Sequence, residues 1–441
     1  MRYVTDYCLE DFILGLKWNN LPEAVKTRLR GCLIDLLGAL VTGSRSEQFE
    51  AGLKLAEQFY LPGNVPVIGS DKTFSVDGAA AAMGHSSNAH DIDDGHNIIR
   101  AHPGTSFIGG ILAEAWDKDL SFEDLLTALL AAYETSIRSG IAIMDYYQFA
   151  HSSGTFGSVG VAAGVGRIRG YSREQLNNVL SVAEFNAPLV PGIRSVEYPS
   201  MNKDGVPFGV MIGMLALRAA ECGFTGNKNL LEADEYRYLT EDLGKTWRVL
   251  ELYFKPYPCC RWGHPAIDSV LSLVRENAVR PDEIEHAEIH TFERATLLSK
   301  IIPESADDAQ YNIAYPVAAA LVRGTFSFRE VQKESFADPA IHEMMGRLSF
   351  HVDPECEAAF PGKRFCRAVI KTKDGRVFSS RLFEPDGEAK DNIGREWLSA
   401  KFLRMTEGLL DSASQEKILK AVFEETPSVR TLVKMVNEGL K

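Results

Sequence analysis

The sequence predicts a mainly α protein, in which a smaller α+β domain is inserted into a large all-helical domain. Three observations predict this. Apolar residues recur with helical spacing over the first 270 residues or so, alternate as in half-buried strands after about residue 280, and return to helical spacing from about 394. We expect one domain to comprise 1–274 together with 395–441, and the other 275–394. A chain of 441 residues exceeds what one hydrophobic core usually organises, which fits two domains.

Start and stop signals support the helices of the first part. Leu21-Pro22 is typical of a helix start, and Gly43 of a helix end. Gly157 and Gly160 lie within a later helical pattern, where they would let helices approach closely. Further helices are expected at about 47–60, 76–88, 106–117, 122–143, 156–169, 173–185 and 205–222.

The smaller domain combines strands and helices. Asp374-Gly375 is a strong hairpin signal between two of the expected strands. The strands are expected at 284–292, 347–352, 365–373 and 376–382, and the helices at 309–323 and 327–346.

Composition excludes several classes of function. The net charge of −13 and the absence of a Lys/Arg stripe argue against binding to nucleic acid. No apolar run is long enough to span a membrane, and the N-terminus lacks the pattern of a signal peptide. Seven cysteines at irregular spacing indicate reduced thiols. We therefore expect a soluble, cytoplasmic globular protein.

The segment from Gly84 to Gly104 is the most informative one, because it holds four of the ten histidines and three aspartates. Such a density of ionisable groups is typical of metal binding or proton transfer. A metal site would resemble those of HD-type phosphohydrolases or isoprenoid synthases, yet the aspartates read DxDD and no second metal motif follows. Helix capping and surface ion pairs are the remaining alternative.

Four other segments carry candidate residues. His151 opens HSSGTFGS, and Lys203 precedes a strongly apolar helix, where a lysine hints at an anionic partner. Lys255 and Arg261 stand in KPYPCCRWGHPAID and are candidate clamps for a carboxylate. Tyr315 precedes Pro316 at the start of an apolar helix. The lack of GxSxG and GxGxxG motifs argues against covalent catalysis and nicotinamide chemistry.

In this order, AHDIDDGH…HPG, HSSGTFG, SMNKDGVPFG, GFTG, KPYPCCRWGHPAID and NIAYPVAAAL resemble the MmgE/PrpD family over nearly the full chain. That family includes 2-methylcitrate dehydratase, cis-aconitate decarboxylase and iminodisuccinate epimerase. The resemblance implies a helical domain with a smaller α+β domain, a homodimer, and a site without metal or cofactor. It implies catalytic roles for Asp91, His102, His151, Lys203 and Tyr315, and a place in the same site for Lys255, which we take with Arg261 to bind substrate.

The shared chemistry is a carbanion formed next to a carboxylate of a small di- or tricarboxylate. We expect His102 to act as base or acid, oriented by Asp91, with His151 and Tyr315 supplying protons. The other ionisable members of the segment are expected to support them: His85, His90, His96, Asp93 and Asp94.

A hydro-lyase of the 2-methylcitrate dehydratase type is the leading hypothesis, and an iminodisuccinate-type epimerase is its runner-up. A cis-aconitate-type decarboxylase ranks lower, because Gly95 stands where the decarboxylase-like pattern has threonine. Two alternatives come from other classes: a metal-dependent hydrolase or synthase at the DxDD cluster, and a carboxylate-binding protein without activity.

Overall fold

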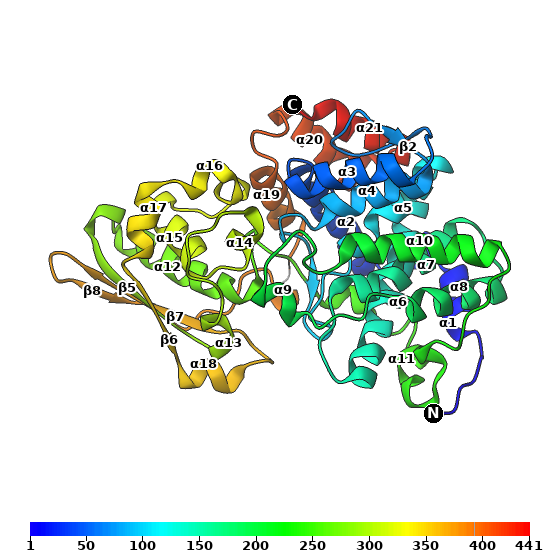
Figure 1. Ribbon diagram of the computed structural model, residues 1–441, viewed down its shortest axis with the longest axis horizontal. Coiled ribbons are helices and arrows are strands. Elements are labelled where there is room, and N and C mark those ends of the chain that lie inside the picture. The colour runs from blue at the N-terminus through cyan, green and yellow to red at the C-terminus, as the bar shows by residue number, and fades with distance from the viewer. Residues whose placement is uncertain (392) are drawn as a thin grey trace.

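Two large clusters of buried side chains divide the chain into two units. The computed structural model describes residues 1–391 and 393–441. One cluster gathers side chains from Leu9 to Phe254 and again from Leu398 to Val436, and we call this part the helical unit. The second cluster runs from Cys259 to Ile370 and defines the α+β unit. In Figure 1 the C-terminal helices, orange to red, lie beside the blue N-terminal helices. The predicted fold class, mainly α with a smaller α+β part, is confirmed.

The clusters change near residue 257, whereas we expected the boundary at 275. Helix α12 (His264–Asn277) contains that expected boundary. Its Ile267 and Val270 are buried in the second cluster, together with Ile370 of the sheet. The apolar face of a helix can be recognised in a sequence, but not the partner that covers it.

Long helices dominate the helical unit, and most of them agree with the expected ranges. The α-helices of this unit, long and short, are α1 (Cys8–Gly15), α2 (Glu23–Gly43), α3 (Glu47–Phe59), α4 (Val76–Ser87), α5 (Thr105–Asp117), α6 (Phe122–Tyr147), α7 (Ser153–Ile168), α8 (Arg173–Phe185), α9 (Ile193–Glu197), α10 (Val206–Glu221), α11 (Tyr238–Glu241), α19 (Arg395–Met405), α20 (Ser412–Lys420) and α21 (Val429–Gly439).

The α+β unit has one four-stranded sheet, of order β6-β5-β7-β8, in which only β5 and β6 are parallel. The expected hairpin is present, and Gly375 in its turn has φ 87°. The expected helix at 327–346 is instead a 3₁₀ helix (Phe328–Val331) followed by two short α-helices, the second starting at Pro339, which suits a first helical turn. The strands are β5 (Ile284–Thr291), β6 (Leu348–Val352), β7 (Cys366–Thr372) and β8 (Val377–Ser379). Its helices besides α12 are α13 (Glu293–Thr296), α14 (Ala306–Gln310), α15 (Ala314–Arg323), α16 (Lys333–Phe336), α17 (Pro339–Met345) and α18 (Pro354–Ala359).

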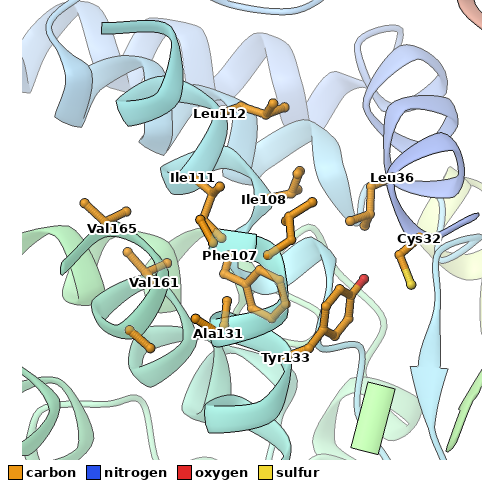
Figure 2. Close-up of a cluster of buried hydrophobic side chains, with 14 of the residues drawn as sticks. Cys32, Leu36, Phe107, Ile108, Ile111, Leu112, Ala131, Tyr133, Val161 and Val165 are labelled. Atoms are coloured by element: carbon orange, nitrogen blue, oxygen red, sulfur yellow. The ribbon is translucent and has the colours of Figure 1, made fainter. Parts of the chain in front are cut away.

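Helix α5 lies at the centre of the helical unit, where it packs against α4, α7 and α6. Figure 2 shows Phe107 of α5 against Tyr133 of α6, with ring centroids 4.9 Å apart and the rings nearly perpendicular. A Cβ on Gly157 of α7 would lie 2.3 Å from the Cβ of Ser106, and one on Gly160 would lie 2.6 Å from Phe107. These glycines therefore permit the close helix contact that the sequence predicts.

Two short antiparallel pairs were not expected from the sequence: β1 (Val65–Pro66) with β2 (Thr73–Phe74), and β3 (Gly95–His96) with β4 (Leu252–Tyr253). The second pair matters for function, because it joins the histidine-rich segment to the chain just before Lys255. In the part of the chain that the structure describes, no helix has both the length and the apolar character needed to cross a membrane.

Candidate active site

A cavity of about 390 Å³ lies where the two units meet, a size that suits a small-molecule ligand. Asp91, His102 and His151 line it from the helical unit, and Lys255 and Arg261 from the segment that joins the units. Five of the seven predicted site residues, far apart in the chain, thus meet around one cavity.

The carboxylate of Asp91 is the hub of the charged groups. Its Oδ1 lies 2.5 Å from Lys255 Nζ and 3.2 Å from His102 Nε2. The Lys255 ammonium also donates to the backbone carbonyl of Asp91 at 2.9 Å. Asp91 has φ 49°, a left-handed conformation that non-glycine residues rarely adopt. The contacts with Lys255 and His102 hold this residue in place and offset the strain.

The imidazole of His102 lies between two carboxylates. Its Nδ1 is 3.1 Å from Asp93 Oδ2, on the opposite side of the ring from Asp91. Burial and the Lys255 ammonium lower the pKa of His102, but the Asp93 and Asp91 carboxylates raise it more, to about 9. His102 is therefore a charged imidazolium at neutral pH.

Asp93 and Asp94 lie at the N-terminus of α5. The hydroxyl of Thr105 donates to Asp93 at 2.9 Å, and the backbone N–H of Gly104 donates to Asp94 at 3.0 Å. Burial raises the pKa of Asp93, but His102 and the other partners lower it by a larger amount, to about 2. Burial raises the pKa of Asp94 to about 7, although Tyr133 donates a hydrogen bond to it. Asp93 therefore carries the charge that stabilises the His102 imidazolium.

Unlike His102, His151 makes no ion pair with a carboxylate among the described residues. It is buried against the ring of Phe149, with centroids 3.9 Å apart. Neither ring nitrogen has a hydrogen-bond partner among the described residues. Burial lowers the pKa of His151 to about 4, so that the imidazole is neutral at pH 7.

Lys203 lies beneath the site and not in the cavity lining given by the described residues. Its ammonium binds the backbone carbonyls of Asn88 and Ala89 and the side chains of Gln310 and Asp307. These contacts connect the end of α4 with α14, directly before Asp91. Lys203 is thus placed to position Asp91.

Tyr315 is also separated from the cavity. Its side chain is fully buried in the second cluster, and its hydroxyl donates to the Glu330 carbonyl at 2.6 Å. Tyr311, four residues earlier, lines the cavity instead and donates to Asp204 at 3.3 Å. Sequence reasoning missed both Tyr311 and Asp204, although Asp204 stands in the same motif as Lys203 and Tyr311 directly precedes the motif of Tyr315.

The supporting histidines expected around the site lie outside the lining of the cavity in the described residues. His96 binds Glu251 at 3.0 Å, next to the β3–β4 pair. Burial lowers the pKa of His90 to about 3 and that of His85 to about 4. That these histidines support the site stays a prediction.

Sequence reasoning also missed most of the cavity's cations. The lining includes Arg100, Arg294 and Arg364 besides Lys255 and Arg261. Arg100 lies in the histidine-rich segment, Arg294 in α13 and Arg364 shortly before β7, so no single sequence motif contains the three arginines.

Asp91, His102 and Asp204 are the one group among the described residues whose ligand atoms all lie within 4.8 Å of one another, as in a metal site. A divalent ion there would compete with the Lys255 ammonium for Asp91, and with the proton that makes His102 a cation. These residues therefore suit proton transfer better than metal binding.

A larger hollow of about 690 Å³ lies over α12 and the 381–391 segment. Three cations line it, Arg275, Arg381 and Lys390, against five carboxylates: Asp268, Glu276, Glu384, Asp386 and Asp391. This excess of negative charge makes it a poor site for an anionic substrate, so we assign the active site to the smaller cavity.

Comparisons with known proteins agree with the motifs. The model of the MmgE/PrpD N-terminal domain matches residues 8–240, and that of the MmgE/PrpD C-terminal domain matches 257–425. A cis-aconitate decarboxylase-like protein of Aspergillus oryzae is 22% identical over 98% of this chain and 96% of its own length. The human cis-aconitate decarboxylase is 22% identical over 96% and 93%, and the mouse one 23% over 93% and 88%. The family resemblance predicted from the sequence is confirmed.

Proposed function

Because the chain belongs to the MmgE/PrpD family, we propose that it is an acid/base lyase acting on a small di- or tricarboxylate. The charge of the cavity carries this proposal. Five cationic side chains and the charged His102 line it, against the carboxylates Asp91 and Asp204. In a chain with a net charge of −13, this local excess of positive charge favours a polyanionic ligand.

The two histidines supply an acid and a base. His102 is protonated near pH 7 and His151 is neutral, because their surroundings move their pKa values in opposite directions. Such a divergence is typical of paired groups that give and accept protons in one reaction. The cations would stabilise the negative charge that develops when a proton leaves a carbon next to a carboxylate.

The leading reaction is the elimination of water. His151 takes the proton from the carbon next to a carboxylate, and the resulting electron pair forms a carbon–carbon double bond. His102 gives its proton to the departing hydroxyl group, which leaves as water. His151 then loses its proton and His102 regains one, through solvent, before the next turnover.

Decarboxylation is the second candidate, and the names of the three relatives favour it. In that reaction a carbon–carboxylate bond breaks, carbon dioxide leaves, and His102 would protonate the carbanion left behind. Gly95 marks a difference in sequence from the decarboxylase-like pattern. A Cβ at Gly95 would lie 2.3 Å from the Tyr253 hydroxyl, so a threonine there requires Tyr253 to move.

The test is NMR of the purified enzyme in D₂O with citrate, 2-methylcitrate, cis-aconitate and iminodisuccinate. We expect loss or addition of water, with deuterium at the carbon next to a carboxylate. Release of carbon dioxide would favour the second candidate, and inversion without loss of a group would identify an epimerase. Binding without exchange or turnover would contradict the proposal. His102→Ala should lower turnover by about a hundredfold or more while the protein stays folded.

A further inference from the structure

Arg261 and Arg364 belong to one chain of hydrogen bonds at the cavity wall. Arg364 Nη1 donates to Asn97 Oδ1 at 2.7 Å, and Asn97 Nδ2 donates to Glu388 Oε2 at 2.7 Å. The other carboxylate oxygen, Glu388 Oε1, accepts from Arg261 Nη2 at 2.7 Å. Glu388 therefore bridges the two arginines through Asn97, and all four side chains hold one another in fixed positions.

Further contacts restrain Arg261. Its Nη1 donates to the Asp386 carbonyl at 2.8 Å, and its guanidinium lies over the Tyr253 ring, 4.6 Å from the centroid. Burial raises the pKa of Glu388, but Arg261 and Asn97 lower it by a larger amount, so its carboxylate is charged. The four groups are thus held before any ligand arrives, which lowers the entropy cost of binding.

Both arginines line the cavity and are held there with little exposure to solvent. Arg261 and Arg364 are 4% and 8% exposed, so their guanidinium charges are largely desolvated. With Glu388 counted, the two arginines carry one net positive charge, which matches a single carboxylate.

We propose that the guanidinium groups of Arg364 and Arg261 bind a second carboxylate of the substrate, with Asn97 and Glu388 as positioning residues. This inference rests on the proposed function, because it assigns one of the carboxylates of the di- or tricarboxylate. Lys255 is less suited to that task, since its ammonium is engaged by Asp91. Arg364 thereby becomes a residue that selects substrates with more than one carboxylate.

These four side chains, Arg261, Arg364, Asn97 and Glu388, form a clamp that also joins the two units of the fold. Asn97 follows β3 of the helical unit, whereas Arg364 precedes β7 of the α+β unit. Arg364 reaches the cavity only when the two units pack as observed. Binding of the second carboxylate would therefore favour the packed arrangement of the units.

Binding of unreactive ligands tests the inference independently of turnover. Tricarballylate offers three carboxylates but no hydroxyl group to eliminate, and butanoate offers one carboxylate. Kd is measured by calorimetry for tricarballylate and by ligand-observed NMR for butanoate. Arg364→Met should raise the Kd of tricarballylate by about tenfold or more, and that of butanoate by less than about twofold. Arg376→Met, at the exposed hairpin, is the matched control and should change neither value.

Arg364→Lys guards against a folding defect, because it keeps the charge but lacks the planar guanidinium group. It should still weaken tricarballylate binding by about threefold or more while the melting temperature stays near that of the wild type. The inference is overturned if both variants bind tricarballylate as the wild type does, or if both ligands weaken equally. Selective weakening in a protein without turnover would instead retain the clamp and reject the proposed lyase activity.

Discussion

Asp93→Asn is the sharpest test of how the site sets the charge of His102. Asp93 is fully buried, and its Oδ2 lies 3.1 Å from His102 Nδ1. Thr105 donates to Oδ2 at 2.9 Å, and Asn88 donates to Oδ1 at 3.0 Å. Asparagine has almost the same shape but no charge, so the substitution removes one of the two carboxylates that raise the pKa of His102.

The distance between the His102 and Asp93 charges sets the size of the expected pKa shift. Two unit charges 3.1 Å apart interact by roughly 5 kcal/mol at an effective dielectric constant of about 20, or about four pKa units. Asp91 still stabilises the imidazolium from the other side of the ring. We therefore expect the pKa of His102 to fall by at least about two units, from about 9 to roughly 7 or lower.

The assay is the pH dependence of kcat/KM, with an NMR titration of ¹³C-labelled histidine. If His102 is the acid, the alkaline limb of the wild-type profile lies near pH 9 and moves to about pH 7 in Asp93→Asn. At pH 8 the variant should lose roughly tenfold in kcat/KM while keeping more of its activity at pH 6. Thr105→Val is the control, because it removes a hydrogen bond to Asp93 without removing the charge. An alkaline limb that stays near pH 9 in Asp93→Asn would refute the assignment of His102 as the charged acid.

Three further predictions follow from other parts of the structure. Exhaustive treatment with EDTA should leave turnover within about twofold of that of the untreated enzyme, because the Lys255 ammonium engages Asp91. A lasting loss of turnover that Mg²⁺ or Mn²⁺ restores would contradict proton transfer without a metal. Lys401→Met should lower the free energy of unfolding in urea by about 3–5 kcal/mol, since it leaves Asp35 buried and unpaired; a loss below about 1 kcal/mol would show that the ion pair contributes little. The folded pKa of His151, about 4, lies below its ordinary value of 6.5, so the unfolded chain binds the proton first on acidification. The stabilising contribution of neutral His151 is therefore complete above pH 6.5 and is lost between pH 6.5 and 4. The free energy of unfolding in urea should fall less steeply with acidification in His151→Leu than in the wild type. Equal slopes of this free energy against pH in the two proteins would reject the lowered pKa.

Local patterns in the sequence were enough to predict most helices, the strands of the sheet and the family. The spacing of apolar residues in α2 and the turn signal at Asp374-Gly375 depend only on neighbours along the chain. The second buried cluster begins before the expected boundary at 275, because α12 has an apolar face that either unit could have covered. The short β3–β4 pair escaped prediction, because two residues are too few to show an alternating pattern.

For the site, the sequence by itself singled out three segments that line one cavity: those around Asp91 and Lys255, which are dense in ionisable residues, and that around His151, which matches a family motif. Only the tertiary structure decided the charge of each group, since a pKa depends on burial and on charges that arrive from distant segments. It left His102 charged and His151 neutral, and it placed Tyr311 instead of Tyr315 at the cavity. It also brought Arg364 to the cavity wall beside Asn97, a contact across 267 residues of chain that no local pattern encodes.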